Sequence, residues 1–373
     1  MSKKYCIFLT ILFSLFIGGI LVCSILLPDQ QFSPMENRYL ASAPKLTLEN
    51  VDSGKFMEDA EDYVNDHVIG RDFWVALKAW GERLSGKQEN NGVYFGKEDT
   101  LLNRVETPSQ STLETDAGFV NQLVDNVDVP VYFGLIPTST AIWSDRLPKG
   151  APTANQKAII DTMYNAVQTH TVDLYSALEA HKDEDIYYRT DHHWTSLGAY
   201  YGYEALMQAM GMEAVPLDES AKVTVTDQFY GTTFSTSGVR WVAPDSIDRY
   251  ISGDGVKVTS YFDGTPSEGS LYVDSYLSEK DKYSSFLGGN QPLCVLKNEH
   301  NPDGGKILLV RDSYSDSLAP FLAQSFSEVH LLDLRYYRAP VAQYAAENGI
   351  DEIVVLYSVP NFITDRNLVL LTQ

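Results

Sequence analysis

The stretch "KILLVRDSYSDSLAPFLAQSF", residues 306–326, decides the fold class that the sequence predicts. An apolar run typical of a buried strand leads through a short polar turn directly into a segment with helical spacing. Similar units recur from residue 110 onward, with apolar strands in "VPVYFGLIPTST", "EVHLLDLRYY" and "DEIVVLYS". Strands that alternate with helices of ten or more residues predict a mostly parallel sheet with helices on both faces.

Other segments of the chain add smaller elements to this pattern. Residues 54–86 have helical spacing with a break at Gly70, and "NGVYFGKEDTLL", residues 91–102, is typical of a hairpin. "DIYYRT", residues 185–190, is expected to form a short strand. Residues 213–290 are polar and rich in Tyr, Ser and Gly, and we expect them to form a β-rich insertion beside the sheet.

The N-terminal region predicts a membrane anchor. Tyr5 to Leu27 form a nearly unbroken apolar run of 23 residues, and a bilayer needs about 20. Lys3 and Lys4 precede it, so the positive-inside rule leaves the N-terminus in the cytoplasm. A cleaved signal peptide is the competing interpretation, but the run is longer than the usual signal core. We therefore expect a single-pass protein of the cell membrane with its main domain outside the cytoplasm.

These patterns predict three regions along the chain. Residues 1–28 form a cytoplasmic stub and transmembrane signal anchor, and residues 29–53 a juxtamembrane connector rich in Pro, Ser, Asn and Asp. Residues 54–373 form one α/β domain that carries the insertion at about 213–290.

Charge and cysteine content restrict the classes of partner. The chain has 50 acidic and 28 basic residues and a formal net charge of −22, which repels nucleic acid and other anionic polymers. We therefore expect no nucleic-acid partner. Cys294 is the only cysteine beyond the apolar run, so packing rather than a disulfide has to stabilise the outer domain.

The serine after the first strand quoted is a candidate for chemistry. A side chain there projects from the carboxyl end of a strand, where open α/β sheets bind ligands. Ser313 also lies next to the N-terminus of the following helix, whose free N–H groups stabilise a developing negative charge. Ser315 and Ser317 compete with it, and serines at such junctions are also common helix caps. Spacing alone leaves both roles open.

The stretch "YYRTDHHWTSLGAYYG", residues 187–202, is the second candidate. As a metal site it is poorly arranged, because His192 and His193 are neighbours and point to opposite sides of an extended chain. As a helix start it uses Thr190 or Asp191 as the cap and leaves both histidines without a role.

A proton relay is the third interpretation of this stretch. Asp191 and His193 are two positions apart and face the same side of an extended segment. Serine is unreactive unless a base removes its proton, and a carboxylate orients that base. Asp191, His193 and Ser313 therefore form a candidate triad, and Trp194 either supports the loop or packs in the core.

The same residues resemble a known family. "YYRTDHHWTSLGAYYGYEAL" is similar to the signature of the DHHW family of bacterial surface proteins, which are similar to the alginate O-acetylation proteins AlgX and AlgJ and related to SGNH hydrolases. "FYGTTFSTSG" and "VRDSYSDSLAPFL" resemble later motifs of that family, and Asp-x-His precedes Ser as in its alginate-type branch. Arg311 departs from the pattern, because many SGNH serine motifs have Gly two residues before the serine.

The resemblance implies an SGNH-hydrolase-like three-layer α/β/α fold with a mostly parallel sheet. The sequence pattern adds the β-rich insertion and one N-terminal transmembrane helix before this fold. It assigns the nucleophile to Ser313, the base to His193 and the orienting carboxylate to Asp191, and it needs no metal or dissociable cofactor. The implied reaction moves an acetyl group, from a multipass membrane O-acyltransferase, through Ser313 to a polysaccharide hydroxyl or to water. A noncatalytic glycan-binding or scaffold subunit and a metal-dependent phosphoesterase are the alternatives.

Overall fold

The computed structural model describes residues 2–26, 28, 30–33, 35–36 and 38–373, which form two compact units. The N-terminal unit extends to Asn90 and includes Ser235–Trp241, and the large unit comprises Asn91–Phe234 and Val242–Gln373. The region boundaries expected from the sequence stay predictions.

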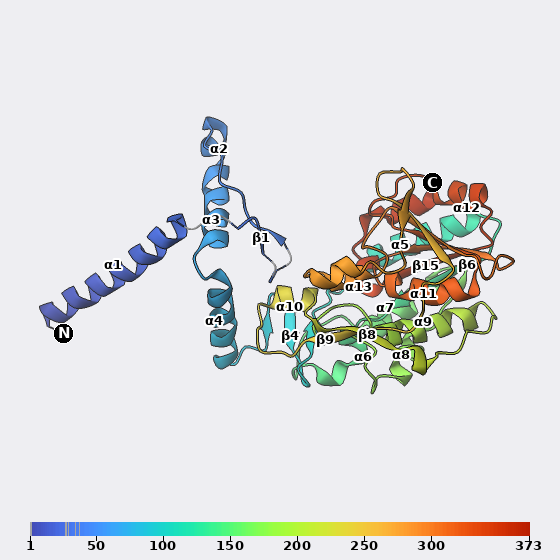
Figure 1. Ribbon diagram of the computed structural model, residues 1–373, viewed down its shortest axis with the longest axis horizontal. Coiled ribbons are helices and arrows are strands. Elements are labelled where there is room, and N and C mark those ends of the chain that lie inside the picture. Colours follow the sequence, from blue (N-terminus) through green and yellow to red (C-terminus); the bar gives the residue numbers. More distant parts are fainter. Residues whose placement is uncertain (1, 27, 29, 34, 37) are drawn as a thin grey trace. The chain divides into compact units, whose positions relative to one another are not determined.

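The N-terminal unit is mostly helical. Its elements in chain order are α1 (Lys3–Leu26), β1 (Phe32–Ser33), β2 (Arg38–Tyr39), α2 (Leu48–Asp52), α3 (Lys55–His67), α4 (Arg71–Leu84) and β3 (Glu89–Asn90). Among the described residues, α1 is the one helix that is long enough and apolar enough to cross a membrane. Leu27, the last residue of the predicted anchor, lies outside the described residues. The predicted break between α3 and α4 is confirmed at Gly70, whose φ of +69° suits a residue without a Cβ (Figure 1).

An eight-stranded sheet forms the centre of the large unit, with the strand order β11-β10-β12-β14-β13-β15-β6-β7. The strands of this unit are β4 (Val93–Phe95), β5 (Leu101–Asn103), β6 (Val131–Ile136), β7 (His170–Thr171), β8 (Val223–Phe229), β9 (Asp245–Arg249), β10 (Val256–Tyr261), β11 (Ser267–Gly269), β12 (Leu293–Asn298), β13 (Lys306–Arg311), β14 (Glu328–Leu332) and β15 (Glu352–Ser358). Strands β14, β13, β15, β6 and β7 are parallel, whereas β12, β10 and β11 are joined antiparallel at one side.

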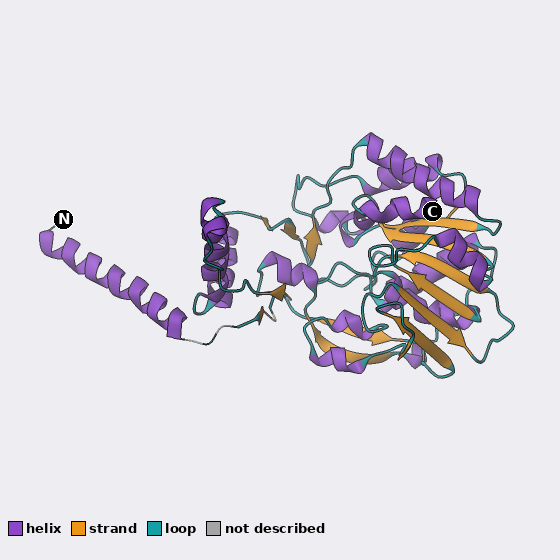
Figure 2. Cartoon of the chain, turned by 90° about the horizontal axis from the view of Figure 1, so that it is seen from above, coloured by secondary structure: helices purple, strands orange, loops and turns teal. Residues whose placement is uncertain are grey.

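Helices cover both faces of this sheet, as Figure 2 shows. The helices from residue 110 onward are α5 (Gln110–Asn126), α6 (Ser139–Ile142), α7 (Gln156–Ala166), α8 (Leu174–Ala180), α9 (Ser196–Ala209), α10 (Thr232–Ser237), α11 (Ser315–Ser325), α12 (Val341–Asn348) and α13 (Val359–Phe362), and the 3-10 segments are Ser144–Arg146, Glu219–Ala221, Asp274–Ser278, Lys282–Ser285 and Arg366–Thr372. Side chains of β13 alternate between two cores: Ile307 and Leu309 pack with α9 and α11, and Leu308 and Val310 pack with α5 and α7. A strand that is buried on both faces has a continuous apolar sequence. The apolar run of β13 therefore agrees with a sheet that is covered by helices on both faces.

Two expectations about smaller elements differ from the structure. Residues 185–190 form no strand beyond an isolated bridge between Tyr187 and Trp194, because the segment turns back on itself. The predicted insertion is only partly beside the sheet: β8 and β9 form a separate antiparallel pair, but β10 and β11 extend the main sheet. The predicted hairpin of β4 and β5 is confirmed, with Val93 opposite Asn103.

Candidate active site

Ser313 lies where the sequence predicts it, between the end of β13 and the start of α11. β13 is a central strand of the parallel part of the sheet, flanked by β14 and β15. The serine is 9% exposed and lies at the carboxyl end of the strand, where open α/β sheets bind ligands.

The structure brings the three residues of the candidate triad together. His193 Nε2 lies 2.8 Å from Ser313 Oγ, and His193 Nδ1 lies 2.6 Å from Asp191 Oδ1. Both distances are those of hydrogen bonds, and they connect the two nitrogens of one imidazole to a hydroxyl and to a carboxylate. This is the arrangement in which a carboxylate fixes the tautomer of a histidine that accepts a serine proton.

Asp191 is buried and is held by four hydrogen bonds. Its Oδ1 accepts a hydrogen bond from the backbone N–H of His193 at 3.0 Å in addition to the contact with the ring. Its Oδ2 accepts from the backbone N–H and the hydroxyl group of Thr232, at 2.7 and 2.9 Å. A Cβ on Gly231 would lie 2.2 Å from the carboxylate, so the residue before Thr232 has to be glycine for this close approach.

The charge state of Asp191 follows from these contacts. Burial by itself raises the pKa of this carboxyl group, but His192, His193 and the hydrogen bonds act in the opposite direction and together hold the pKa well below its ordinary value. The carboxylate therefore stays ionised over the whole range in which an enzyme is assayed, and it favours a positive charge on His193.

Tyr283 packs against one face of the His193 imidazole ring. The rings of Tyr283 and His193 are stacked, with centroids 3.7 Å apart and an angle of 6° between the planes. The Tyr283 hydroxyl donates to the backbone carbonyl of Ser313 at 3.0 Å, and burial raises its pKa well above the ordinary value, so it stays neutral. One side chain thus fixes the positions of both the histidine and the serine.

Trp194 connects the histidine loop to α11. Its side chain is fully buried, and its Nε1–H donates to the carbonyl of Tyr314 at 2.9 Å and to the hydroxyl of Ser317 at 3.0 Å. The Tyr314 hydroxyl donates in the other direction, to the carbonyl of His192. The tryptophan therefore supports the site through hydrogen bonds as well as by packing.

Asp312 and Arg311 shape the turn before α11. Asp312 Oδ1 accepts from the backbone N–H of Tyr314 at 3.0 Å, and its Oδ2 accepts from the N–H and hydroxyl groups of Ser358 at the end of β15. Arg311 is completely buried, and its Nη1 lies 2.8 Å from Oδ1 of Asp316 in the first turn of α11. Arg311, which stands where many SGNH serine motifs have Gly, is thus paired with an acidic residue of the same motif.

His192 lies closer to His193 than the sequence argument allowed. The expectation that neighbouring residues diverge was wrong, because residues 188–193 form a closed turn: the N–H of Tyr188 donates to the carbonyl of His193 at 3.2 Å. The two imidazole centroids are 3.8 Å apart. One ligand atom each from Asp191, His192 and His193 lies within 4.8 Å of the others, a group that could hold a metal ion. In the structure His192 Nδ1 instead lies 2.6 Å from the Thr232 hydroxyl.

The alternative helix-start roles are also resolved by the structure. The cap of α9 is Thr195, whose side chain accepts from the N–H of Gly198, and neither Thr190 nor Asp191 has this role. The first residue before α11 is Tyr314, and no side-chain cap occurs there. The Ser317 hydroxyl contacts Trp194 Nε1 and the Tyr283 hydroxyl, each at 3.0 Å.

Sequence reasoning missed two residues that contact the triad. Thr232 belongs to "FYGTTFSTSG", a motif in which neither its role nor that of Gly231 was recognised. Tyr283 lies in the short 3-10 segment Lys282–Ser285, and no pattern in the sequence marks it. Only the folded chain shows these contacts, because the partners are 41 and 30 residues apart.

Comparisons with known proteins found one matching family model and several similar solved structures. A family model described as DHHW protein matches residues 107–332. A solved DHHW family protein from Eubacterium siraeum is 26% identical with a TM-score of 0.67, over 76% of this chain and 95% of that chain. Bacillus cereus PatB1 is 21% identical with a TM-score of 0.61, over 74% and 98% of the two chains. The O-acetyltransferase domain of Pseudomonas putida AlgJ is 16% identical with a TM-score of 0.46, over 74% and 93%.

No curated protein sequence matches the chain. The likeness to PatB1 concerns the fold, and it agrees with the three-layer arrangement described above. The family model covers more than half of the chain and includes every residue of the candidate triad. The resemblance noted in the sequence is confirmed: this chain belongs to the DHHW family.

Proposed function

We propose that this protein is a serine O-acetyltransferase that modifies a cell-surface or exported polysaccharide outside the cytoplasm. The observation that carries the proposal is the continuous contact from Asp191 through His193 to Ser313, at 2.6 and 2.8 Å. The membership in the DHHW family and the similarity of the motifs to those of alginate O-acetylation proteins support the choice of an acetyl group and a glycan.

The reaction has two half-steps that use the same residues. In the first, Ser313 Oγ attacks the acetyl carbonyl carbon while His193 Nε2 takes the hydroxyl proton, and the leaving group departs with that proton. In the second, a sugar hydroxyl gives its proton to His193 and attacks the acetyl carbonyl carbon of the acetyl-serine. The acetyl group moves to the sugar oxygen, and His193 returns the proton to Ser313 Oγ. Asp191 holds the imidazole and stabilises its charged form in both steps.

The developing negative charge needs a donor close to Ser313. The backbone N–H groups of the next three residues are already used inside the turn: Tyr314 donates to Asp312 Oδ1, Ser315 to the Asp312 carbonyl and Asp316 to the Ser313 carbonyl. The backbone N–H of Ser313 itself is therefore the donor that we assign to the oxyanion, and a second donor is left unassigned.

The acetyl donor in this proposal is a multipass membrane O-acyltransferase that brings acetyl groups across the bilayer. The apolar helix α1 supports a location next to such a partner, because it is long enough to anchor the chain in the same membrane. Transfer to water instead of a sugar would make the same site an acetylesterase, since both reactions share the acetyl-serine intermediate.

Intact-protein mass spectrometry tests the proposal directly. The full chain in detergent is incubated with an activated acetyl ester, and the modified residue is identified by peptide mapping. We expect one acetyl adduct on Ser313, and no adduct on Ser313→Ala or His193→Ala. Ser315→Ala is the matched control, because its hydroxyl lies on the first residue of α11 and has no partner among the described residues.

The alternatives give different results in the same experiment. A chelator should leave adduct formation unchanged, whereas a metal-dependent phosphoesterase would lose activity. Folded protein that forms no adduct and turns over no ester, even with its membrane partner and glycan, would refute the proposal and favour a scaffold role.

A further inference from the structure

His192 is the exposed neighbour of the candidate triad, and the proposed proton transfers do not use it. Its ring centroid lies 3.8 Å from that of His193. The His192 side chain is 31% exposed, whereas the side chains of His193 and Asp191 are 6% and 2% exposed. Of the two imidazoles beside Ser313, the one without a role in proton transfer is therefore the one that a second substrate meets first.

The hydrogen bonds of Thr232 determine which nitrogen of His192 carries the proton. A hydroxyl group has one proton to donate, and an ionised carboxylate can only accept. The Thr232 hydroxyl therefore donates to Asp191 Oδ2, at 2.9 Å. Its contact of 2.6 Å with His192 Nδ1 is then a hydrogen bond that the nitrogen donates. In its neutral form His192 thus carries the proton on Nδ1 and a free electron pair on Nε2.

The surroundings of His192 keep this imidazole neutral at pH 7. Desolvation by the packed side chains, and then the neighbouring His193, lower its pKa to about 4. Arg335 acts in the same direction, whereas Asp191 and Asp312 oppose the shift. At neutral pH His192 Nε2 is therefore a hydrogen-bond acceptor and has no proton to donate.

Nε2 of His192 is directed away from Asp191 and is open to solvent. The Nδ1 atoms of His193 and His192 lie 2.6 and 3.6 Å from Asp191 Oδ1, and the two nitrogens of an imidazole point in nearly opposite directions. In His193 the direction away from the carboxylate leads to Ser313. The Tyr314 hydroxyl donates to the carbonyl of His192, so this residue also adjoins the serine turn. Among the described residues no group bonds to His192 Nε2, and it is not one of the buried polar atoms that lack a partner.

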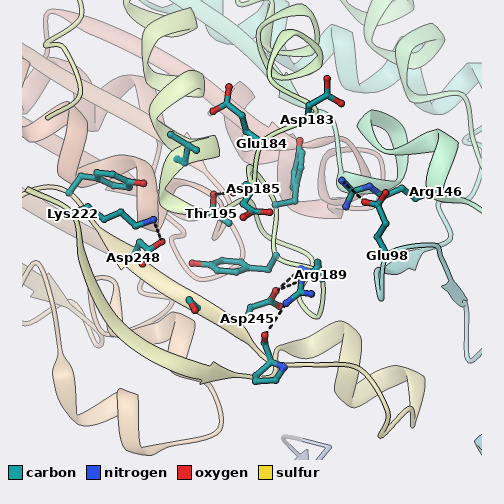
Figure 3. A pocket seen from close by; sticks show the side chains of 16 residues that line it. Glu98, Arg146, Asp183, Glu184, Asp185, Arg189, Thr195, Lys222, Asp245 and Asp248 are labelled. Carbon is teal, nitrogen blue, oxygen red and sulfur yellow. Dashed lines mark hydrogen bonds and ion pairs between the residues drawn. The ribbon is translucent and has the colours of Figure 1, made fainter. Parts of the chain in front are cut away.

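The loop that carries both histidines is held from its other side by β9. Asp245 accepts hydrogen bonds from the backbone N–H and from Nε of Arg189, at 3.1 and 3.3 Å, and dashed lines connect the two side chains in Figure 3. The backbone N–H of Thr190 donates to the same carboxylate at 2.8 Å. A side chain on a loop that is fixed in this way is preorganised, so it binds a second group without first losing freedom of movement.

We infer that His192 binds the acceptor: its Nε2 accepts a hydrogen bond from the sugar hydroxyl next to the one that attacks the acetyl-serine. The preferred acceptor is then a vicinal diol, in which one hydroxyl gives its proton to His193 and its neighbour donates a hydrogen bond to His192 without losing its proton. Adjacent hydroxyls of one sugar reach both rings, whose centroids are 3.8 Å apart. A single water molecule cannot make both contacts, so His192 favours transfer over hydrolysis. The inference rests on the proposed function for the acetyl-serine.

The products of acetyl transfer to two simple alcohols test this inference. The full chain in detergent is acetylated with an activated ester and then mixed with trans-1,2-cyclohexanediol or cyclohexanol, which differ in the second hydroxyl group, and the acetate esters are quantified. We expect wild type to acetylate the diol about three- to tenfold more per hydroxyl group, the effect of one neutral hydrogen bond in the transition state. This diol preference is a ratio of products from one acetyl-serine, so a general loss of activity does not change it.

Two substitutions at position 192 separate the acceptor atom from the contact with Thr232. In His192→Asn the short amide replaces Nδ1 as the donor to Thr232, but no atom takes the place of Nε2, and we expect the diol preference to disappear. In His192→Gln the longer side chain brings an amide oxygen near the position of Nε2, and we expect at least about half of the wild-type preference. His300→Asn makes the same change in the exposed loop after β12 and should keep the preference.

Several results would overturn the inference and leave the acetyl-serine unaffected: no diol preference in wild type, an equal preference in His192→Asn, or its loss in His192→Gln as well, which would assign the selection to the ring rather than to Nε2. Variants at position 192 that form no acetyl-serine would also overturn it, because His192 would then act before the acceptor arrives. Wild type that forms no acetyl-serine rejects the proposed function, and the role of His192 is rejected with it.

Discussion

At the scale of single residues, the site depends on how firmly Asp191 is held. The carboxylate receives two hydrogen bonds from His193 and two from Thr232, and it has no freedom to rotate away from the ring. Thr232 also contacts His192 Nδ1 through the same hydroxyl group. A threonine 41 residues away in sequence is therefore the fourth member of the hydrogen-bonded group.

We predict that Thr232→Val lowers the rate of acetyl transfer about ten- to hundredfold, because it removes a hydrogen bond to a charged group worth about 1.5–3 kcal/mol. The rate of acetyl-serine formation in single-turnover experiments is the measurement. Thr232→Ser keeps the hydroxyl group and should keep most of the activity. A Thr232→Val variant as active as wild type would show that the backbone N–H alone is sufficient to hold Asp191.

The lowered pKa of His192 predicts that the stability of the folded protein depends on pH. Burial, and then the neighbouring His193, lower the pKa of His192 from 6.5 to about 4, although Asp191 acts in the opposite direction. The unfolded chain therefore binds one more proton than the folded chain between pH 4 and 6.5, so stability falls as the pH falls through this window. The His192 side chain is 31% exposed, so solvent screens much of this effect. We expect His192→Asn to reduce the loss of Tm on acidification by about 2–4 °C, which corresponds to roughly 1 kcal/mol.

Thermal unfolding of both proteins at pH 7.0 and at about pH 4.5 measures this difference. Asn at position 192 keeps a polar side chain of similar size but has no titrating group. Parallel loss of Tm in the two proteins would show that other groups cause the acid sensitivity.

At the scale of elements, the junction of β13 and α11 has an internal ion pair. Arg311 ends the strand, Asp316 lies in the first turn of the helix, and both side chains are nearly inaccessible, at 0% and 3%. Burial raises the pKa of Asp316 to about 7 even though Arg311 acts against this shift, so the charged pair is costly to bury.

We predict that Asp316→Ala destabilises the protein by about 3–5 kcal/mol, because it leaves the guanidinium group of Arg311 buried without a counter-charge. The double variant Arg311→Met with Asp316→Leu should lose much less stability, since both charges are gone. Urea unfolding followed by tryptophan fluorescence gives the two free energies of unfolding. Equal losses in the two variants would mean that the volume of the side chains, and not their charge, stabilises the junction.

Much of the fold was predictable at this scale, and the reasons for the exceptions are physical. The apolar strands β6, β13, β14 and β15 show their double-sided burial directly in the sequence. β12 was not predicted, because it lies in the antiparallel part of the sheet and ends in polar residues. Residues 185–190 have the composition of a strand, but tertiary hydrogen bonds to Asp245 hold them in a loop.

The candidate site was predictable only in part for a related reason. Asp191 and His193 are two residues apart, and Ser313 follows an apolar strand, so local patterns mark all three. Thr232 and Tyr283 carry no local pattern, and their roles depend on contacts that form after the chain has folded. Local sequence thus marks the residues of the candidate triad better than the residues that contact them.

At the scale of the whole molecule, α1 predicts the location of the protein. We expect the full chain to sediment with membranes and to resist extraction with alkaline carbonate, because the exposed apolar side chains of this helix need lipid around them. Residues 29–373 alone should be released. If cells that express the full chain instead release a soluble form shortened at its N-terminus, the apolar helix is a cleaved signal peptide.

The two edges of the main sheet would matter if several copies were anchored side by side as proposed. The strands at these edges, β11 and β7, are three and two residues long. Copies that share one membrane surface meet far more often than they would in free solution, and a long unpaired strand would recruit its neighbour into a continuous intermolecular sheet. Edges this short offer too few backbone groups for that pairing, so copies anchored as proposed would not join through these strands into one continuous sheet.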